Sequence, residues 1–174
     1  AQPVTSQPTE QISASLSDAD LATQLAHATG ELLVELREQM IRNDTSPWYM
    51  MDAGDALAHR FIVDTLHRVR PNDAVLSEEG ADDSQRLTAD RVWIVDPLDG
   101  TAEFGEAGRD DWAVHIALWE RSAGTQGELT AAAVGLPGLG LTLSTSPAPA
   151  PRATMTRTPL MVVSRSRTPA VAAA

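Results

Sequence analysis

Acidic side chains follow two apolar stretches of the sequence, and their spacing suits metal binding. Residues 92–95 form an apolar run that leads directly into Asp96, and Asp99 follows after Pro-Leu. A second run, residues 74–77, leads in the same way into Glu78. Carboxylate oxygens are the ligands that hard divalent cations such as Mg²⁺ prefer. If the two runs are neighbouring strands, Glu78 and Asp96 share one edge of a sheet and bind one ion, while Asp96 and Asp99 bind a second.

The residues that follow add a seat for a phosphate group. If a helix begins at Gly100 and Thr101, its free backbone amides point at an anion. The Thr101 hydroxyl orients the proton of a metal-bound water, and Asp55 is our candidate for the acid that holds Thr101 in place. The backbone carbonyl of Leu98 faces inward as a further ligand, because Pro97 stiffens the turn. Two metal ions roughly 3.5–4 Å apart clamp the attacking and leaving oxygens of an in-line displacement.

Each of these residues also has a purely structural interpretation, which the sequence alone leaves open. Glu78 and Glu79 suit a solvated acidic turn, Asp99 suits an ordinary turn, and Asp55 suits a helix N-terminus, where a carboxylate stabilises the dipole. We interpret His115 as a core or inter-strand histidine, and the tryptophans as packing residues. The combination of an acidic pair after one strand and Asp-Pro-Leu-Asp-Gly-Thr after the next is more specific than any of its parts.

The elements that position these residues alternate between helical and strand patterns. Apolar residues recur at spacings of three and four over residues 18–42, which predicts a long helix capped by Ser17 or Asp18. Residues 43–51 are predicted to be a packed connection and residues 52–70 a second helix. A short helix is predicted at residues 102–104. The predicted strands cover residues 74–77, 92–95, 112–119, 130–136, 139–143 and 160–163, and the fourth and fifth of them form a hairpin.

This order of elements predicts an α/β fold with four segments. Residues 1–16 are polar and are predicted to be a disordered N-terminal tail. Residues 17–143 are predicted to be an N-terminal metal-binding α+β domain. Residues 144–159, rich in Pro, Ala, Ser and Thr, are predicted to be a linker or mobile loop. Residues 160–174 are predicted to begin a C-terminal α/β domain that this sequence truncates.

Composition narrows the classes of function. The sequence has 174 residues, a formal net charge of −11 and no cysteine. An acidic surface argues against binding to nucleic acid polymers or anionic membranes, and it means that an anionic substrate needs a local positive centre such as bound metal. The absence of cysteine excludes disulfides and thiolate metal sites. With no signal peptide and no apolar run long enough to cross a membrane, we expect a cytoplasmic protein.

The sequence resembles the inositol monophosphatase-like superfamily of magnesium-dependent, lithium-inhibited phosphatases. Glu78-Glu79 and the stretch from Trp93 to Thr101 carry the resemblance. Glu103-Phe104 after Thr101, together with the later Ser164-Arg165-Ser166, is similar to the CysQ branch, the 3′(2′),5′-bisphosphate nucleotidases of sulfur assimilation. The resemblance covers about residues 18 to 167 and implies the layered α-β-α-β-α fold of the sugar phosphatases.

The resemblance also implies roles for individual residues. The ligands of the first metal are Glu78, Asp96 and the Leu98 carbonyl, and those of the second are Asp96 and Asp99. Water activation falls to Asp55 and Thr101, phosphate binding to the Gly100 and Thr101 amides, and nucleotide contact to Ser164 and Arg167. The cofactor is Mg²⁺, roughly two or three ions per site, with inhibition by Li⁺.

The chain departs from the branch in three ways. Ala102 stands where the branch has Lys or Arg, and Arg167 stands where it has His. The family's C-terminal portion, with a Trp-Asp motif whose aspartate completes the second metal site, does not occur in this sequence. We therefore expect this chain alone to hold the first metal site and a weakened second one.

The predicted function is magnesium-dependent hydrolysis of 3′-phosphoadenosine 5′-phosphate to AMP and phosphate. One alternative is the same chemistry on an inositol or sugar phosphate. A second alternative, of a different class, is a catalytically incomplete fragment or binding module. The expected partner is a small phosphorylated substrate, and a homodimer is left open.

Overall fold

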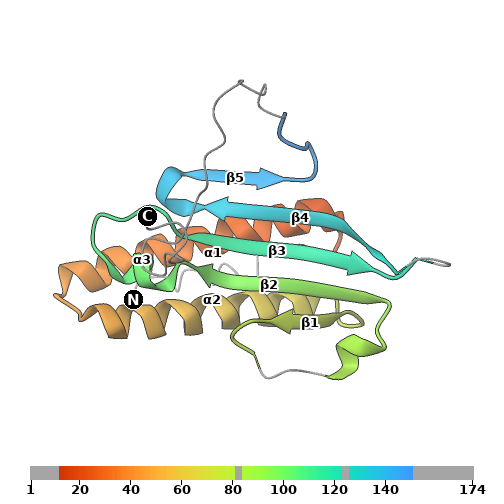
Figure 1. The fold of residues 1–174 in the computed structure, drawn as a ribbon, viewed down its shortest axis with the longest axis horizontal. Coiled ribbons are helices and arrows are strands. Elements are labelled where there is room, and N and C mark those ends of the chain that lie inside the picture. Colours follow the sequence, from red (N-terminus) through yellow and green to blue (C-terminus); the bar gives the residue numbers. More distant parts are fainter. Residues whose placement is uncertain (1–11, 81–83, 123–125, 151–174) are drawn as a thin grey trace, which may run out of the picture.

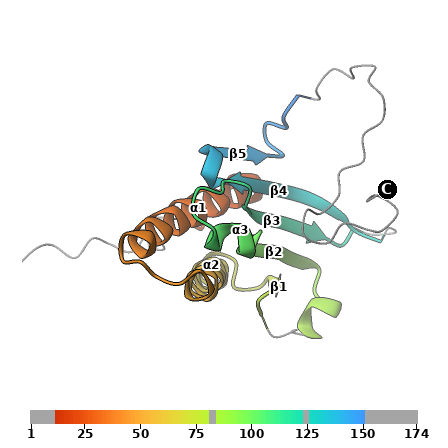
Figure 2. The ribbon, with the colours of Figure 1, turned by 60° about the vertical axis from the view of Figure 1, so that its left-hand side comes forward.

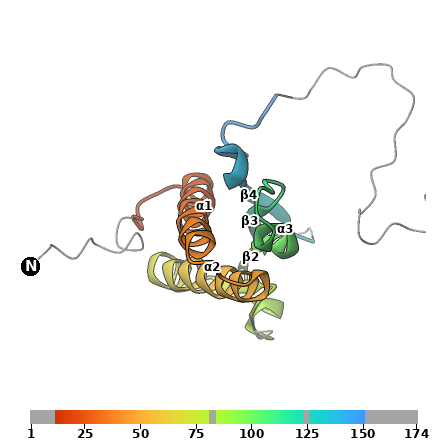
Figure 3. The ribbon, with the colours of Figure 1, turned by 90° about the vertical axis from the view of Figure 1, so that its left-hand side faces the viewer.

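A five-stranded sheet with two long helices against one face forms the framework of the chain. The structure, a computed structural model, describes residues 12–80, 84–122 and 126–150. The strands lie in the order β1-β2-β3-β4-β5, and the edge-on view of Figure 3 shows α1 and α2 on one side of them. This is the α/β fold that the sequence predicts. The elements are α1 (Asp18–Arg42), α2 (Pro47–Val69), β1 (Ala74–Ser77), β2 (Arg91–Asp99), α3 (Thr101–Gly105), β3 (Ala113–Glu120), β4 (Glu128–Leu136) and β5 (Leu141–Ser144), as labelled in Figure 1.

Pairing within the sheet combines one parallel contact with an antiparallel meander. β1 runs parallel to β2, and β2, β3, β4 and β5 are paired antiparallel. A 3₁₀ turn, Pro137–Leu139, joins β4 to β5, so the predicted hairpin is confirmed. The parallel pair matters for function because its two strands end at the same edge of the sheet, beside α3 (Figure 2).

The first helix begins and ends where the sequence predicts. Ser17 is its N-cap, and the Ser17 hydroxyl accepts a hydrogen bond from the Asp20 amide at 3.2 Å. The second helix, in contrast, begins at Pro47 and not at residue 52. Ser46 takes the N-cap position and Pro47 the first helical position, where a missing backbone N–H costs nothing. The prediction of a connection through residue 51 is therefore wrong.

The side chains at the start of α2 also differ from expectation. Met50 is buried, but Trp48 and Tyr49 are 76% and 65% exposed. The interpretation of Trp48 as a packing residue is wrong, whereas Trp93 and Trp112 are buried as expected.

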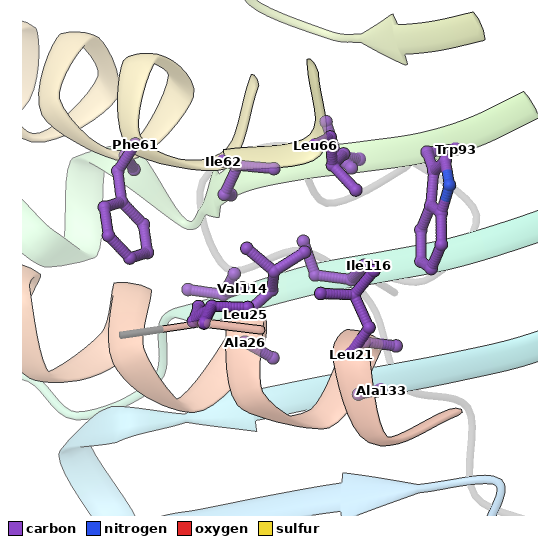
Figure 4. Close-up of a cluster of buried hydrophobic side chains, with 14 of the residues drawn as sticks. Leu21, Leu25, Ala26, Phe61, Ile62, Leu66, Trp93, Val114, Ile116 and Ala133 are labelled. Carbon is purple, nitrogen blue, oxygen red and sulfur yellow. The ribbon is translucent and has the colours of Figure 1, made fainter. Parts of the chain in front are cut away.

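The core fills the space between the two helices and the sheet. Alternate residues of β3, namely Val114, Ile116 and Leu118, point into it, as the alternation of apolar residues predicts. Trp93 and Val95 of β2 point the same way. Figure 4 shows Trp93, Val114 and Ile116 meeting side chains from both helices; the labelled residues are Leu21, Leu25, Ala26, Phe61, Ile62, Leu66, Trp93, Val114, Ile116 and Ala133.

Ion pairs join the start of α1 to the start of β2 and the end of β3. Asp18 accepts from Arg70 at 2.9 Å and from Arg91 at 2.9 Å. Arg91 also pairs with Asp73 at 3.0 Å and with Glu120. One cluster therefore joins α1, the end of α2, β2 and β3.

Residues before α1 pack against the same end of the molecule. Ile12 is 4% exposed, and its carbonyl accepts a hydrogen bond from Arg68 at 3.0 Å. Arg70 donates to the carbonyls of Ala14 and Leu16. Ile12 and Leu16, which the sequence assigns to a disordered tail, are thus packed against the fold, while residues 13–15 between them are exposed. In the part of the chain that the structure describes, no helix has the length and apolar character needed to cross a membrane.

Candidate functional site

Parallel pairing of β1 with β2 brings the first two predicted metal ligands together. Ser77 is the register partner of Val95, and the Glu78 amide donates to the Val95 carbonyl at 3.2 Å. Glu78, just after β1, therefore lies beside Asp96 of β2, and the charge of Glu78 helps to raise the pKa of Asp96. This is the adjacency that the sequence predicts for two strands ending at one edge.

An irregularity in β2 determines where Asp99 lies. The strand does not end before the motif but continues through Asp96 to Asp99. Asp96 pairs with His115 and Asp99 pairs with Ala113, so three steps along β2 match two along β3. Such a β-bulge shifts the alternation of side chains by one residue. Asp96 and Asp99 consequently face the same side of the sheet, the side away from α1 and α2.

The carboxylates crowd one another. Burial raises the pKa of Asp96 to about 6, and the negative charges of Glu78 and Asp99 add to the effect, while His115 opposes it. The His115 Nε2 lies 3.2 Å from a carboxylate oxygen of Asp99. The interpretation of His115 as an inter-strand residue is confirmed, but its carboxylate partner was not foreseen. A site that disfavours its own negative charges gains stability from a cation.

Thr101 and Asp55 meet across the site as the sequence predicts. The Thr101 Oγ1 lies 3.3 Å from Asp55 Oδ1 and 3.0 Å from the Leu98 carbonyl oxygen. A hydroxyl has one proton, so these two acceptors compete for it. Because α2 begins at Pro47, Asp55 lies in its third turn, which excludes the interpretation of Asp55 as a carboxylate that stabilises the helix dipole.

The environment of Asp55 suits it to accept a proton near neutral pH. Burial raises the pKa of Asp55 to about 6, the charges of Glu79, Asp52 and Asp96 push it the same way, and the Thr101 hydroxyl opposes them. A general base works best when its pKa is near the working pH. A hollow of about 360 Å³ adjoins Asp55 and is lined by Asp52, Asp55, Ala56, His59 and Glu79.

Gly100 and α3 connect the two aspartates of β2 to Thr101. Gly100 has φ of 83°, in the left-handed region, and a Cβ there would lie 3.1 Å from the Asp111 carbonyl oxygen. Any other residue would be strained at this turn. The Gly100 carbonyl accepts from the Phe104 amide at 2.9 Å, which closes the single turn of α3. The predicted short helix is confirmed.

The donor set has the chemistry of a magnesium site but is incomplete. Within residues 12–80, 84–122 and 126–150, no group of three His, Asp or Glu side chains is gathered closely enough to hold one ion. Mg²⁺ commonly takes one or two carboxylates and completes its shell with water and substrate phosphate. The adjacent carboxylates of Glu78 and Asp96 fit that requirement. The Leu98 carbonyl oxygen is engaged by Thr101, so its role as a metal ligand stays a prediction.

The structure leaves some predicted site residues untested and adds others. Ser164 and Arg167, predicted on the nucleotide side, lie outside the described residues, as does the predicted strand 160–163. Arg37 was missed. It lies inside α1, and its guanidinium Nε donates to the Phe104 carbonyl at 2.8 Å. No local pattern marks a contact between residues 67 positions apart.

Comparison with known proteins places this geometry in a family. The model of the inositol monophosphatase family matches residues 15–167. A 3′-phosphoadenosine 5′-phosphate phosphatase of Mycobacterium leprae is 55% identical over 131 residues, which are 73% of this chain and 48% of that protein. The 3′(2′),5′-bisphosphate nucleotidase CysQ of Salmonella typhimurium is 32% identical over 83% of this chain and 62% of its own length. A crystal structure of inositol monophosphatase II from Staphylococcus aureus has a TM-score of 0.58 and 27% identity, over 69% of this chain and 42% of that one. The chain thus spans about half the length of the relatives it matches.

Proposed function

The chain belongs to the inositol monophosphatase family, and we propose that it provides the catalytic carboxylates of a magnesium-dependent phosphatase that hydrolyses 3′-phosphoadenosine 5′-phosphate to AMP and phosphate. The observation that carries the proposal is the meeting of Thr101 with Asp55 beside the Glu78–Asp96 pair. These residues come from α2, the β1 edge, β2 and α3. An acidic turn or a helix cap would need no such convergence.

The residues have separate tasks in this reaction. Glu78 and Asp96, with Asp99, hold Mg²⁺, and bound Mg²⁺ supplies Lewis-acid stabilisation of phosphate and leaving-group charge. Thr101 and Asp55 orient the attacking water and accept its proton, because the pKa of Asp55 is raised to about 6. The Gly100 and Thr101 amides hold the phosphate group. Orientation and charge stabilisation are the main contributions expected in phosphoryl transfer.

Choice of substrate rests on similarity. The mycobacterial relative at 55% identity is named for 3′-phosphoadenosine 5′-phosphate, which favours the nucleotide over an inositol or sugar phosphate. Ser164 and Arg167 stay our candidates for nucleotide contact. This substrate agrees with our proposal that the protein is a cytoplasmic enzyme that acts in sulfur assimilation.

Phosphate release by the 174-residue chain tests the proposal. With Mg²⁺ present, we expect turnover of 3′-phosphoadenosine 5′-phosphate to exceed that of inositol 1-phosphate, and chelation by EDTA to abolish both. Faster release from inositol phosphate would favour the alternative substrate. A folded chain that releases phosphate from neither would support the incomplete fragment or binding module.

A further inference from the structure

α3 is too short to hold its own conformation. It spans Thr101–Gly105, and a helix of about one turn is unstable in water by itself, because nucleation costs more than one hydrogen bond returns. The geometry of Thr101 at its first position therefore depends on contacts with the rest of the fold.

Phe104 provides one of these contacts. Its ring is fully buried and stacks edge-on against Trp112, with 5.1 Å between ring centroids. The Phe104 ring also lies close to Gly54, where an added Cβ would stand 2.7 Å from it. This contact fixes the C-terminal part of α3, where the Glu103 carbonyl accepts from the Glu106 amide at 3.2 Å and the helix ends too soon to supply an amide to the Phe104 carbonyl.

Arg37 of α1 donates to the Phe104 carbonyl and adds a side-chain donor to the Glu103 and Glu106 carbonyls, which also accept from the Glu106 and Arg109 amides. Its Nε donates to the Phe104 oxygen at 2.8 Å, and its Nη2 donates to the Glu106 oxygen at 2.6 Å and lies 3.5 Å from the Glu103 oxygen. The guanidinium carbon also lies 5.7 Å from the Phe104 ring centroid and 5.8 Å from that of Trp112. A planar cation with several fixed donors suits this arrangement of carbonyls and ring faces.

The charge of Arg37 also suits its position. Burial lowers the pKa of the Arg37 guanidinium from its ordinary value, and the nearby Asp110 opposes that shift. Arginine stays protonated in proteins, and a cation at a helix C-terminus interacts favourably with the helix dipole.

We propose that Arg37 is a positioning residue of the site: by binding the C-terminal carbonyls of α3 it holds Thr101, one turn earlier, against Asp55. This inference rests on the proposed phosphatase function for its catalytic consequence. The metal-binding carboxylates Glu78, Asp96 and Asp99 lie on or beside strands, not on α3, so Arg37 acts on the water-orienting pair and not on the metal.

The test compares Arg37→Met and Arg37→Lys with Arg42→Met in the full chain. Arg37→Met keeps the apolar stem and removes the donors, and we expect kcat to fall roughly ten- to hundredfold with no change in the Mg²⁺ concentration for half-maximal activity. Arg37→Lys keeps the charge but has a single donor nitrogen in place of the planar guanidinium, and it should recover part of the loss. Arg42, on the same helix, pairs with the exposed Glu38 at 3.6 Å, the one ion pair found for it among the described residues, so Arg42→Met should behave as wild type.

A double-mutant cycle separates positioning from a general loss of stability. If Arg37 acts through Thr101, then Arg37→Met should cause little further loss of kcat in a Thr101→Ala background. Equal losses in both backgrounds, or an unchanged kcat, would overturn the inference. If Arg37→Met does not fold, Arg37→Lys takes its place in the cycle.

Amide hydrogen exchange tests Arg37 even if the chain has no phosphatase activity. We expect the Phe104 amide, which bonds to the Gly100 carbonyl, to exchange roughly tenfold faster in the Arg37 variants, with β3 amides unchanged. Unchanged exchange at Phe104, or uniform acceleration throughout the chain, would count against Arg37 as a local support. An inactive wild type with this local acceleration would refute the proposed function and leave the positioning contact standing.

Discussion

We expect the negative charge of Asp96 to lower the stability of the metal-free fold and to be required for activity. Its raised pKa means that its negative charge costs free energy in the metal-free fold. At pH 7.5 we expect Asp96→Asn to stabilise the metal-free chain by about 1 kcal/mol, after allowance for screening by solvent. The same change should lower Mg²⁺-dependent turnover by at least about a hundredfold.

Thermal unfolding in EDTA and phosphate release in Mg²⁺ measure these two effects. Asp64→Asn is a matched control, because Asp64 is exposed on the same helix as Asp55 and should change neither quantity. Wild-type turnover in Asp96→Asn would refute the metal assignment.

The pairings of the site residues were predictable to different degrees. Glu78 beside Asp96 follows from the rule that parallel strands end at one edge of a sheet, whereas Thr101 beside Asp55 was expected because the family resemblance implies it. The Asp99–His115 contact depends on the bulge. Pro97 inside a strand was the available signal, because proline in a sheet marks an edge or a bulge. Arg37 had no signal, since its acceptors are backbone carbonyls brought near only by tertiary packing.

At the scale of elements, Asp18 should make the attachment of α1 sensitive to pH. Burial raises its pKa, but hydrogen bonds from Arg91 and Arg70 outweigh burial and leave the pKa below its ordinary value of 3.8. A carboxyl group with a lowered pKa stabilises the fold above about 3.8 and loses that contribution as pH falls through its folded pKa. Asp18→Asn should therefore cost roughly 1–2 kcal/mol near neutral pH and progressively less below pH 3.8.

Urea unfolding of both proteins between pH 3 and pH 7 measures this difference. The opposite trend, with a gap that widens toward acid, would contradict the assigned ion pairs. Asp20→Asn would not serve as a control, because Asp20 accepts a hydrogen bond from the Ser17 cap at 2.6 Å.

Two helical glycines offer a comparison between packing near the site and packing far from it. A Cβ at Gly54 of α2 would lie 2.7 Å from the Phe104 ring and 2.9 Å from Leu98, whereas a Cβ at Gly30 of α1 would lie 2.7 Å from the Pro137 ring. Overpacking of this kind costs roughly 1–3 kcal/mol. Both Gly54→Ala and Gly30→Ala should lower the melting temperature, but only Gly54→Ala should lower kcat. Equal kcat values would show that α2 need not approach α3 closely for catalysis.

The start of α2 shows why one boundary was misplaced. Its apolar periodicity weakens before residue 52, and Trp48 and Tyr49 face solvent although they are large. The stronger signal was local, since Ser46 followed by Pro47 is an N-cap followed by a favoured first helical residue. The Ser46-Pro47 pattern therefore marks the start of α2, which hydrophobic periodicity alone places too late.

Net charge governs the approach of substrate at the scale of the whole molecule. The chain carries −11 at neutral pH, so its field repels a nucleotide with two phosphate groups until the metal is bound. At saturating Mg²⁺, we expect KM for 3′-phosphoadenosine 5′-phosphate to fall by roughly two- to threefold as ionic strength rises from about 0.02 M to 0.15 M, because salt screens that repulsion. A substrate with a single phosphate group should show a smaller change. A KM that rises with salt would indicate a local positive surface stronger than the overall field.

Because of the bulge between Asp96 and Asp99, the function of the motif depends on the spacing of its residues as well as on their identity. Side chains of a regular strand alternate between its two faces, and this stretch contains one residue more than the alternation requires. If β2 were regular through this stretch, the spacing of three residues would turn the Asp99 side chain from the open face into the apolar interior. Each substitution in the motif alters one contact, whereas loss of the bulge would move Asp99 to the other face of the strand.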